Sequence, residues 1–115
     1  MHELSIALSL VDLACEEAGR QGGGRVCALH LKVGALSGVV PDALVASYEM
    51  ACTDTPLAGS RLVIEEVPVV VFCPQCQADR PLDGVQSFCC PDCGTPTPQV
   101  ERGRELELVA MEIEQ

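Results

Sequence analysis

Two Cys-Pro-x-Cys units constrain this chain more than any other feature of its sequence. The units run from Cys73 to Cys76 and from Cys90 to Cys93, and thirteen residues lie between them. Two such turns that face each other bring four thiolates to the corners of a tetrahedron, as in structural zinc sites. Four protein ligands leave no open position for a substrate. The sequence therefore predicts a structural metal lobe, with the function of the protein located elsewhere in the chain.

A fifth thiol, Cys89, directly precedes the second unit and complicates the ligand count. Cys90 leaves a two-residue spacer before Cys93, whereas Cys89 would leave three, which is a poorer metal-binding turn. We therefore predict that Cys73, Cys76, Cys90 and Cys93 bind zinc. Iron in a rubredoxin-like site is the alternative metal, and one unit acting alone as a redox dithiol is the alternative chemistry.

Size and charge narrow the classes of function. The 115 residues suffice for one modest core and a small metal-stapled lobe, and with two Phe, one Tyr and no Trp that core must be aliphatic. The formal net charge of −10 disfavours binding to nucleic acid. No signal peptide opens the chain and no apolar run could span a bilayer, so we expect a cytoplasmic protein without a membrane partner. In that compartment the eight cysteines are expected as thiols or metal ligands.

A hydrophobic period of 3.6 residues predicts two helices, one over residues 4–18 and one from Pro41 to about Thr53. Proline suits the first turn of the second helix because its missing N–H has no helical acceptor there. The expected buried face of the first helix comprises Leu4, Leu8, Val11, Cys15 and Ala18.

Alternating apolar residues predict three strands, over residues 25–33, 61–72 and 104–113. In the first strand the alternation places Cys27 on the buried face and His30 on the opposite face. In the second strand Pro68 cannot donate a ladder hydrogen bond, so we expect a bulge or an edge position near it.

The order of these elements predicts an α+β fold, in which two helices cover one face of a small three-stranded sheet. The last strand is expected to return to the first sheet, which makes the zinc-ribbon lobe an insertion between two strands. The predicted domains are an α+β domain of residues 1–72 and 99–115 and a zinc-binding lobe of residues 73–98. Residues 95–98 are read as an extended exit linker from that lobe.

The first three residues, Met1-His2-Glu3, form a second group with metal-binding character. A bulky second residue keeps the initiator methionine in place, so a free amine stands beside the His2 imidazole. The amine, the neighbouring amide nitrogens and the imidazole suit planar coordination of nickel(II) or copper(II). A helix that begins near Leu4 leaves its first amides without helical acceptors, so metal binding there breaks no helical hydrogen bond. An ordinary surface role is the alternative for His2 on these residues alone.

Several short motifs, in their order and spacing, resemble the hydrogenase nickel-incorporation proteins, the HypA/HybF family. The resemblance covers essentially the whole chain, and its motifs are individually short. They are Met-His-Glu-Leu-Ser at the start, Val33–Gly38 with Val40-Pro41-Asp42, Ile64–Pro68, the paired cysteine units, and Gly103–Leu106.

This resemblance implies a metallochaperone that delivers nickel during the maturation of nickel–iron hydrogenase, with urease maturation as a further role in some members. It implies that His2 is the essential nickel ligand, supported by Met1 and by the backbone or side chain of Glu3, and that the four paired cysteines hold structural zinc(II). The expected partners are the maturation GTPase HypB and the hydrogenase large-subunit precursor.

Two other classes of function are compatible with the residues themselves. A zinc-ribbon adaptor would contact proteins without carrying nickel, and a thiol oxidoreductase would use one Cys-x-x-Cys unit. The sequence contains no Ser-His-Asp set, no phosphate-binding glycine loop and no open zinc site with a general base, so we do not expect an enzyme.

Overall fold

The computed structural model of the chain describes residues 2–83 and 87–114. The chain divides into two compact units, one of Met1–Lys32, Val39–Glu65 and Glu107–Gln115, and one of Val33–Gly38 and Glu66–Leu106. The elements are α1 (Glu3–Arg20), β1 (Arg25–Gly34), α2 (Pro41–Cys52), β2 (Arg61–Val67), β3 (Val70–Cys73), β4 (Ala78–Pro81), β5 (Val100–Arg102) and β6 (Leu106–Glu114).

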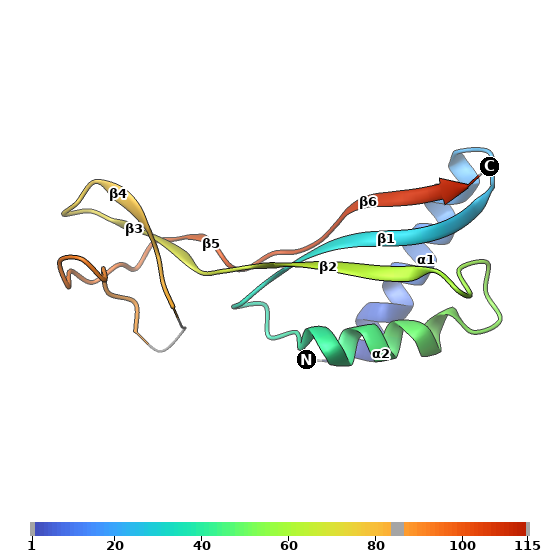
Figure 1. The fold of residues 1–115 in the computed structure, drawn as a ribbon, viewed down its shortest axis with the longest axis horizontal. Helices are drawn as coiled ribbons and strands as arrows, with labels where there is room; N and C mark the ends of the chain where they lie inside the picture. The colour runs from blue at the N-terminus through green and yellow to red at the C-terminus, as the bar shows by residue number, and fades with distance from the viewer. Residues whose placement is uncertain (1, 84–86, 115) are drawn as a thin grey trace. The chain divides into compact units, whose positions relative to one another are not determined.

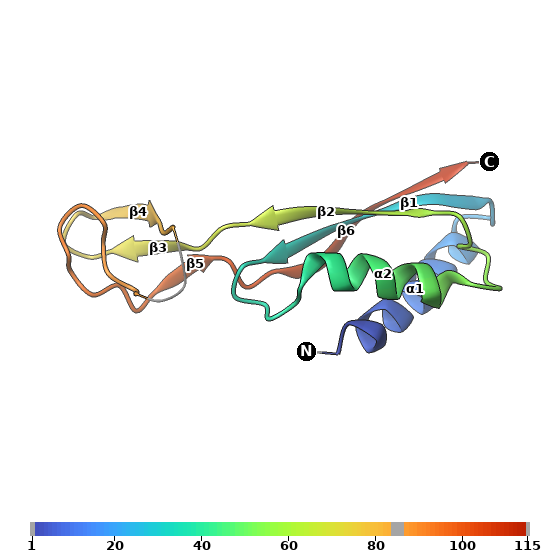
Figure 2. The same ribbon diagram turned by 60° about the horizontal axis from the view of Figure 1, so that its bottom comes forward.

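The first sheet has the strand order β2-β1-β6, and both helices cover the same face of it (Figures 1 and 2). The last strand therefore returns to pair beside the first, as the sequence predicts, and the cysteine-containing segment is inserted between β2 and β6. The α+β fold is thus confirmed. None of the described helices is long and apolar enough to cross a membrane.

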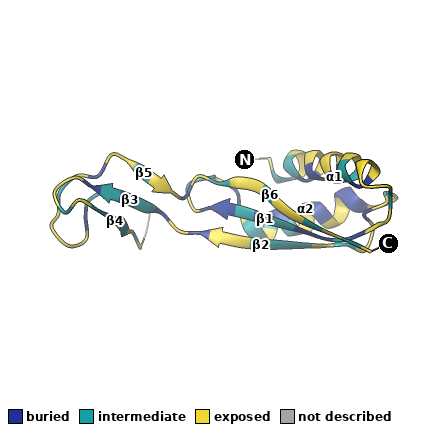
Figure 3. Ribbon diagram, turned by 90° about the horizontal axis from the view of Figure 1, so that it is seen from above, coloured by how far each residue is buried: buried dark blue, intermediate teal, exposed yellow. Residues whose placement is uncertain are grey.

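The core of the first unit is aliphatic around one aromatic ring, Tyr48, which is fully buried with Leu29 of β1 and Leu44 of α2. The predicted buried face of α1 is wrong at its start, because Leu4 and Leu8 are nearly half exposed. Small side chains allow a helix to lie close to its neighbours, and alanines supply most of the face that α1 buries. Figure 3 shows buried and exposed residues alternating along α1. The buried residues of α1 are Ala7, Leu10, Val11, Ala14 and Ala18.

The alternation of β1 changes phase in the middle of the strand. Cys27 Sγ lies 3.7 Å from the carboxylate of Glu114, and His30 Nε2 lies 2.5 Å from that of Glu112, so both side chains are on the same face. The two residues between them are both fully buried. The alternation of β1 therefore shifts by one residue between Cys27 and His30, and the prediction that Cys27 belongs to the buried set is wrong.

The predicted strand of residues 61–72 is two strands rather than one. Strand β2 ends at Val67 and β3 begins at Val70, with Pro68 in the gap. Because proline has no N–H to donate, the ladder stops there, and the chain passes into a second sheet of order β4-β3-β5. The alternation of apolar residues does not reveal this second sheet.

The segment of residues 95–98 is part of the second unit rather than an extended linker. Pro96 forms an isolated β-bridge with Cys89, the Thr97 amide donates to the Phe88 carbonyl at 2.8 Å, and the Thr97 side chain is fully buried. The unit extends beyond residues 73–98 on both sides, since β3 and β5 pair across the cysteine segment.

Candidate metal centres

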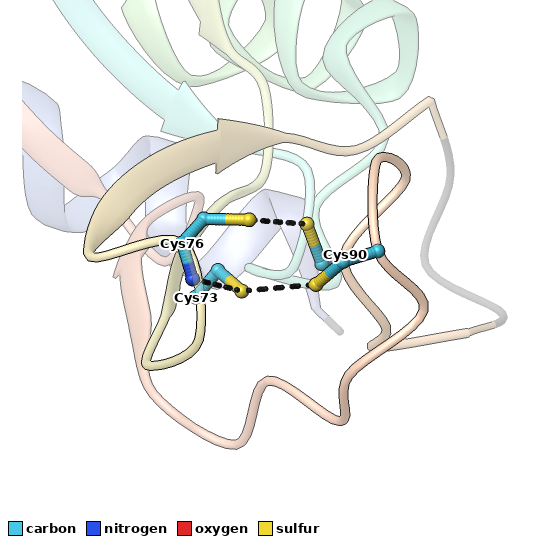
Figure 4. A group of neighbouring side chains, drawn as sticks. Cys73, Cys76 and Cys90 are labelled. Carbon is cyan, nitrogen blue, oxygen red and sulfur yellow. Dashed lines mark hydrogen bonds between the residues drawn. The ribbon is translucent and has the colours of Figure 1, made fainter.

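Four cysteines of the second unit converge on one point. The sulfurs of Cys73, Cys76, Cys90 and Cys93 all lie within 4.8 Å of one another. Two contacts join one Cys-Pro-x-Cys motif to the other, with 3.5 Å between the sulfurs of Cys73 and Cys93 and 3.9 Å between those of Cys76 and Cys90. Figure 4 shows the sulfurs of Cys76 and Cys90 directed at each other from opposite loops. These are the four residues that the sequence predicts as metal ligands.

The spacing of the sulfurs fits a tetrahedral zinc ion. A Zn–S bond of roughly 2.3 Å in a regular tetrahedron holds the sulfurs about 3.8 Å apart, which matches the two cross-unit distances. A redox dithiol would need only the two cysteines of one Cys-Pro-x-Cys motif, whereas here all four sulfurs lie within 4.8 Å of one another and Cys73 lies 3.5 Å from Cys93 of the other motif. The donor set and its geometry therefore suit a closed structural zinc site.

The first loop, residues 73–77, and the second loop, residues 90–94, reach this arrangement through the same local geometry. In each loop the residue after the second cysteine has a left-handed backbone, with φ of 57° at Gln77 and 78° at Gly94. The amide of that residue donates to the carbonyl of the first cysteine at 2.8 Å in both loops. Each turn therefore folds back on itself and directs both of its sulfurs to one side, which is why the short motif alone predicts the site.

Cys89 stands apart from the cluster. It is half-buried, and its backbone takes part in the bridge to Pro96, while the next residue, Cys90, is buried with its sulfur in the cluster. Successive residues of extended backbone point to opposite sides, so the two thiols are separated by geometry.

The surroundings of the cluster favour thiolates on one side of it. Hydrogen bonds from the side chain and backbone of Thr95 lower the pKa of Cys93 to about 6, and the sulfur lies 3.2 Å from the Thr95 hydroxyl. Arg80, which follows the first loop on β4, forms an ion pair with Asp92 inside the second loop. Nothing in the local sequence pattern around Arg80 marks it as a neighbour of the cluster.

The predicted nickel ligands lie at the start of α1. His2 is exposed and is the N-cap residue of the helix, and its carbonyl accepts the first helical bond from Ile6 at 3.2 Å. Its side chain makes no capping hydrogen bond, so the imidazole is free of that role. Met1, the third member of the predicted group, lies outside the described residues.

Glu3 has a defined place beside this terminus. Its carboxylate accepts a hydrogen bond from the Val40 amide at 3.3 Å. Hydrogen bonds from its own backbone amide and from that of Val40 hold the pKa of Glu3 below its usual range. This contact, which the sequence does not reveal, connects the first residue of α1 to the residue that precedes α2.

A family model and individual relatives match nearly the whole chain and describe the same kind of protein. A family model described as hydrogenase/urease nickel incorporation, metallochaperone, matches residues 1–113. The hydrogenase maturation factor HypA of Chloroflexus aurantiacus is 54% identical over 112 residues, which cover 97% of this chain and 98% of that protein. The factor of the same name from Deinococcus radiodurans is 47% identical over 108 residues, 94% of this chain and 89% of that protein.

Two solved structures share the fold. The solution structure of the Ni metallochaperone HypA from Helicobacter pylori aligns with a TM-score of 0.67 at 21% identity, over 98% of this chain and 97% of that one. A solution structure of a HypA protein aligns with a TM-score of 0.71 at 22% identity, over 99% of this chain and 97% of that one.

Proposed function

Because the chain belongs to the HypA family of hydrogenase maturation factors, we propose that it is a metallochaperone that binds nickel(II) at its amino terminus and delivers it to a nickel–iron hydrogenase under assembly. His2 is the nickel ligand in this proposal, together with the terminal amine of Met1 and the backbone nitrogens of the first residues. The same family assignment supports a role as a carrier rather than an enzyme.

One observation carries the proposal, namely the contrast between the two candidate centres. The four sulfurs form a closed set with no place for an exchanging ligand. The His2 imidazole, by contrast, is exposed at the N-terminus of α1, where the amides of the first turn have no helical carbonyl acceptors. A closed centre suits a resident ion, and an open terminal centre suits a cargo that must be accepted and released.

The resident ion that we propose is zinc, held by Cys73, Cys76, Cys90 and Cys93. Zinc bound to four thiolates has no redox chemistry and contributes folding energy to the lobe that contains it. The second unit positions the sulfurs for zinc. The two loops orient them, and the short β4-β3-β5 sheet supports the loops.

The protein partners that we propose follow from the family resemblance. They are the maturation GTPase HypB and the precursor of the hydrogenase large subunit, and a urease precursor is the alternative recipient of nickel. The negative net charge of the chain supports binding to metal cations and to basic protein surfaces rather than to nucleic acid.

A nickel titration of the zinc-loaded protein tests the proposal. The protein must carry its native terminus, because a tag ahead of Met1 would remove the free amine. We expect one nickel ion per chain, with an absorption band typical of planar nitrogen coordination. The His2→Ala variant should lose this nickel and keep its zinc.

The His30→Ala variant is the matched control, since His30 is the only other histidine and lies on the sheet against Glu112. It should bind nickel as the wild type does. Equal nickel binding by the wild type and by His2→Ala would contradict the assignment of His2. Absence of specific nickel binding in all three proteins would favour a zinc-ribbon adaptor without nickel cargo.

A further inference from the structure

Strand pairing places Arg80 on the face of the second sheet that carries the metal-binding loop. Arg80 of β4 pairs directly with Val71 of β3, and Cys73 lies two residues further along β3. Paired residues of neighbouring strands share a face, and so do alternate residues of one strand. Both Val71 and Cys73 are fully buried, so the Arg80 side chain starts on the buried face of the sheet beside the first cysteine.

The side chain then reaches the second loop. Arg80 Nε is inaccessible to solvent and lies 3.2 Å from Asp92 Oδ2, an ion pair in which Nε makes no hydrogen bond to any described residue, and Asp92 is located between Cys90 and Cys93. The Arg80 side chain is 29% exposed, whereas that of Asp92 is 62% exposed. One residue of the sheet therefore connects the strand that follows the first loop with the middle of the second loop.

The guanidinium is also close to the metal-binding sulfurs. It is adjacent to the sulfurs of Cys76 and Cys90, one from each loop. Because a guanidinium is always charged in proteins, Arg80 places a cation where the two loops meet. The planar guanidinium carries several N–H donors, so it can interact with the carboxylate and with the sulfurs at the same time. The compact ammonium of a lysine would do so less well.

A zinc ion bound by four thiolates carries a negative charge that a neighbouring cation would offset. Four thiolates and one zinc ion together carry a net charge of about −2, and they lie in a chain that is already strongly acidic. Negative charge on the sulfurs makes them more reactive toward protons and electrophiles. A cation with N–H donors at two of the four sulfurs offsets that charge and holds the loops in the geometry that binds the metal.

We propose that Arg80 is a positioning residue of the zinc centre: it ties the second loop to β4 through Asp92 and shields the sulfurs of Cys76 and Cys90. The inference rests on the zinc occupancy proposed above. It explains how the protein retains its resident zinc while a second metal ion binds and leaves elsewhere in the chain.

The test uses the full-length, zinc-loaded protein and the Arg80→Gln variant. The rate of zinc transfer to a chromophoric chelator and the rate of thiol alkylation by iodoacetamide are measured for each protein. We expect both rates to rise roughly tenfold in Arg80→Gln, as is typical when a residue that supports metal ligands is removed. Arg102→Gln is the matched control, because Arg102 is an exposed arginine of the same unit. It should leave both rates unchanged.

A spectroscopic measurement separates this role from a general contribution to folding. In cobalt(II)-substituted protein, the sulfur-to-cobalt charge-transfer band should shift in Arg80→Gln and stay in place in Arg102→Gln, because only the former removes donors from the sulfurs. Asp92→Asn keeps the arginine and weakens its anchor, so it should accelerate zinc transfer less than Arg80→Gln. This milder variant also serves if Arg80→Gln fails to fold.

Zinc transfer and cobalt spectra in Arg80→Gln that match the wild type would overturn the inference, and so would equal acceleration in Arg102→Gln. If Arg80→Gln does not fold, wild-type zinc transfer in Asp92→Asn would overturn it. Both results are distinguishable from failure of the zinc assignment itself, in which freshly purified wild-type protein would contain no stoichiometric zinc.

Discussion

The Glu3 carboxylate accepts a hydrogen bond from the backbone amide of Val40 at 3.3 Å. The contact spans 37 residues of sequence and joins the starts of the two helices, since Glu3 begins α1 and Val40 is the N-cap residue of α2. Its own backbone amide donates to the same carboxylate. Both routes by which Glu3 could support nickel binding, through the side chain or through the backbone nitrogen, therefore compete with a contact inside the protein.

A pair of substitutions at Glu3 distinguishes these routes. Glu3→Ala removes the carboxylate and keeps the amide, so we expect it to retain one nickel per chain. Glu3→Pro also removes the amide proton, and proline is tolerated at the first position of a helix, so α1 should persist while planar nitrogen coordination is lost. Nickel titration and circular dichroism check both variants. Loss of nickel in Glu3→Ala equal to that in His2→Ala would identify the carboxylate as a ligand instead.

Serine substitutions at the two adjacent thiols test which of them belongs to the zinc centre. Cys90 has its sulfur in the cluster, and Cys89 is half-buried outside it. We expect Cys89→Ser to purify with one zinc per chain and Cys90→Ser to lose most of its zinc, because a centre that loses one of four thiolates binds zinc much more weakly. Elemental analysis of the purified proteins gives the zinc content. Full zinc content in Cys90→Ser, with loss in Cys89→Ser, would reverse the assignment.

Two glycine-to-alanine substitutions should have opposite effects on stability. A Cβ at Gly34 would lie 2.1 Å from the Gly103 carbonyl oxygen, and that oxygen is held by the Leu36 amide at 2.6 Å. Gly34→Ala should therefore destabilise the protein by about 3 kcal/mol or more. Gly19 lies within α1 with no atom near its added Cβ, so Gly19→Ala should stabilise by roughly 0.5–1 kcal/mol. Urea unfolding of the zinc-loaded proteins measures both. A Gly34→Ala protein as stable as the wild type would show that the two segments can separate at little cost.

The buried hydroxyl of Tyr48 should contribute a measurable hydrogen bond. It lies 2.6 Å from the Ser60 hydroxyl, and burial raises the pKa of Tyr48, so the phenol stays protonated. We expect Tyr48→Phe and Ser60→Ala each to lower the free energy of unfolding by about 1 kcal/mol. Because they remove the same bond, the double variant should lose less than the sum of the two. Strict additivity in urea unfolding would mean that the bond contributes nothing to stability.

Agreement between pattern and structure is closest where the determining interactions are local. The paired cysteine loops depend on spacing, proline and one left-handed residue each, all within five residues of chain, so their sequence predicts the four-sulfur cluster. Helix periodicity likewise predicts α2 to within one residue at its end. The predicted nickel role of His2 stays a prediction, since its ligand chemistry also involves a residue outside the described part of the chain.

Periodicity was least informative where two faces of an element are both apolar. In α1 the leucines and the alanines form adjacent stripes, and the pattern favours the larger side chains, whereas close helix packing selects the alanines. In β1 the alternation shifts by one residue between Cys27 and His30, and no residue in that stretch indicates the shift. Which residues of an element are buried depends on the surface that packs against it, and this is a property of the folded molecule.

By itself, the sequence determined the class of fold, the return of the last strand to the first sheet and the four cysteines that share one centre, because each depends on spacing along a short stretch or on the order of elements. Only the tertiary structure decided that the chain changes sheets at Pro68, that Glu3 binds the Val40 amide and that Arg80 lies against both metal-binding loops. Each of these contacts joins residues that are apart in the sequence or depends on strand register, and the register is set by the packing of buried faces.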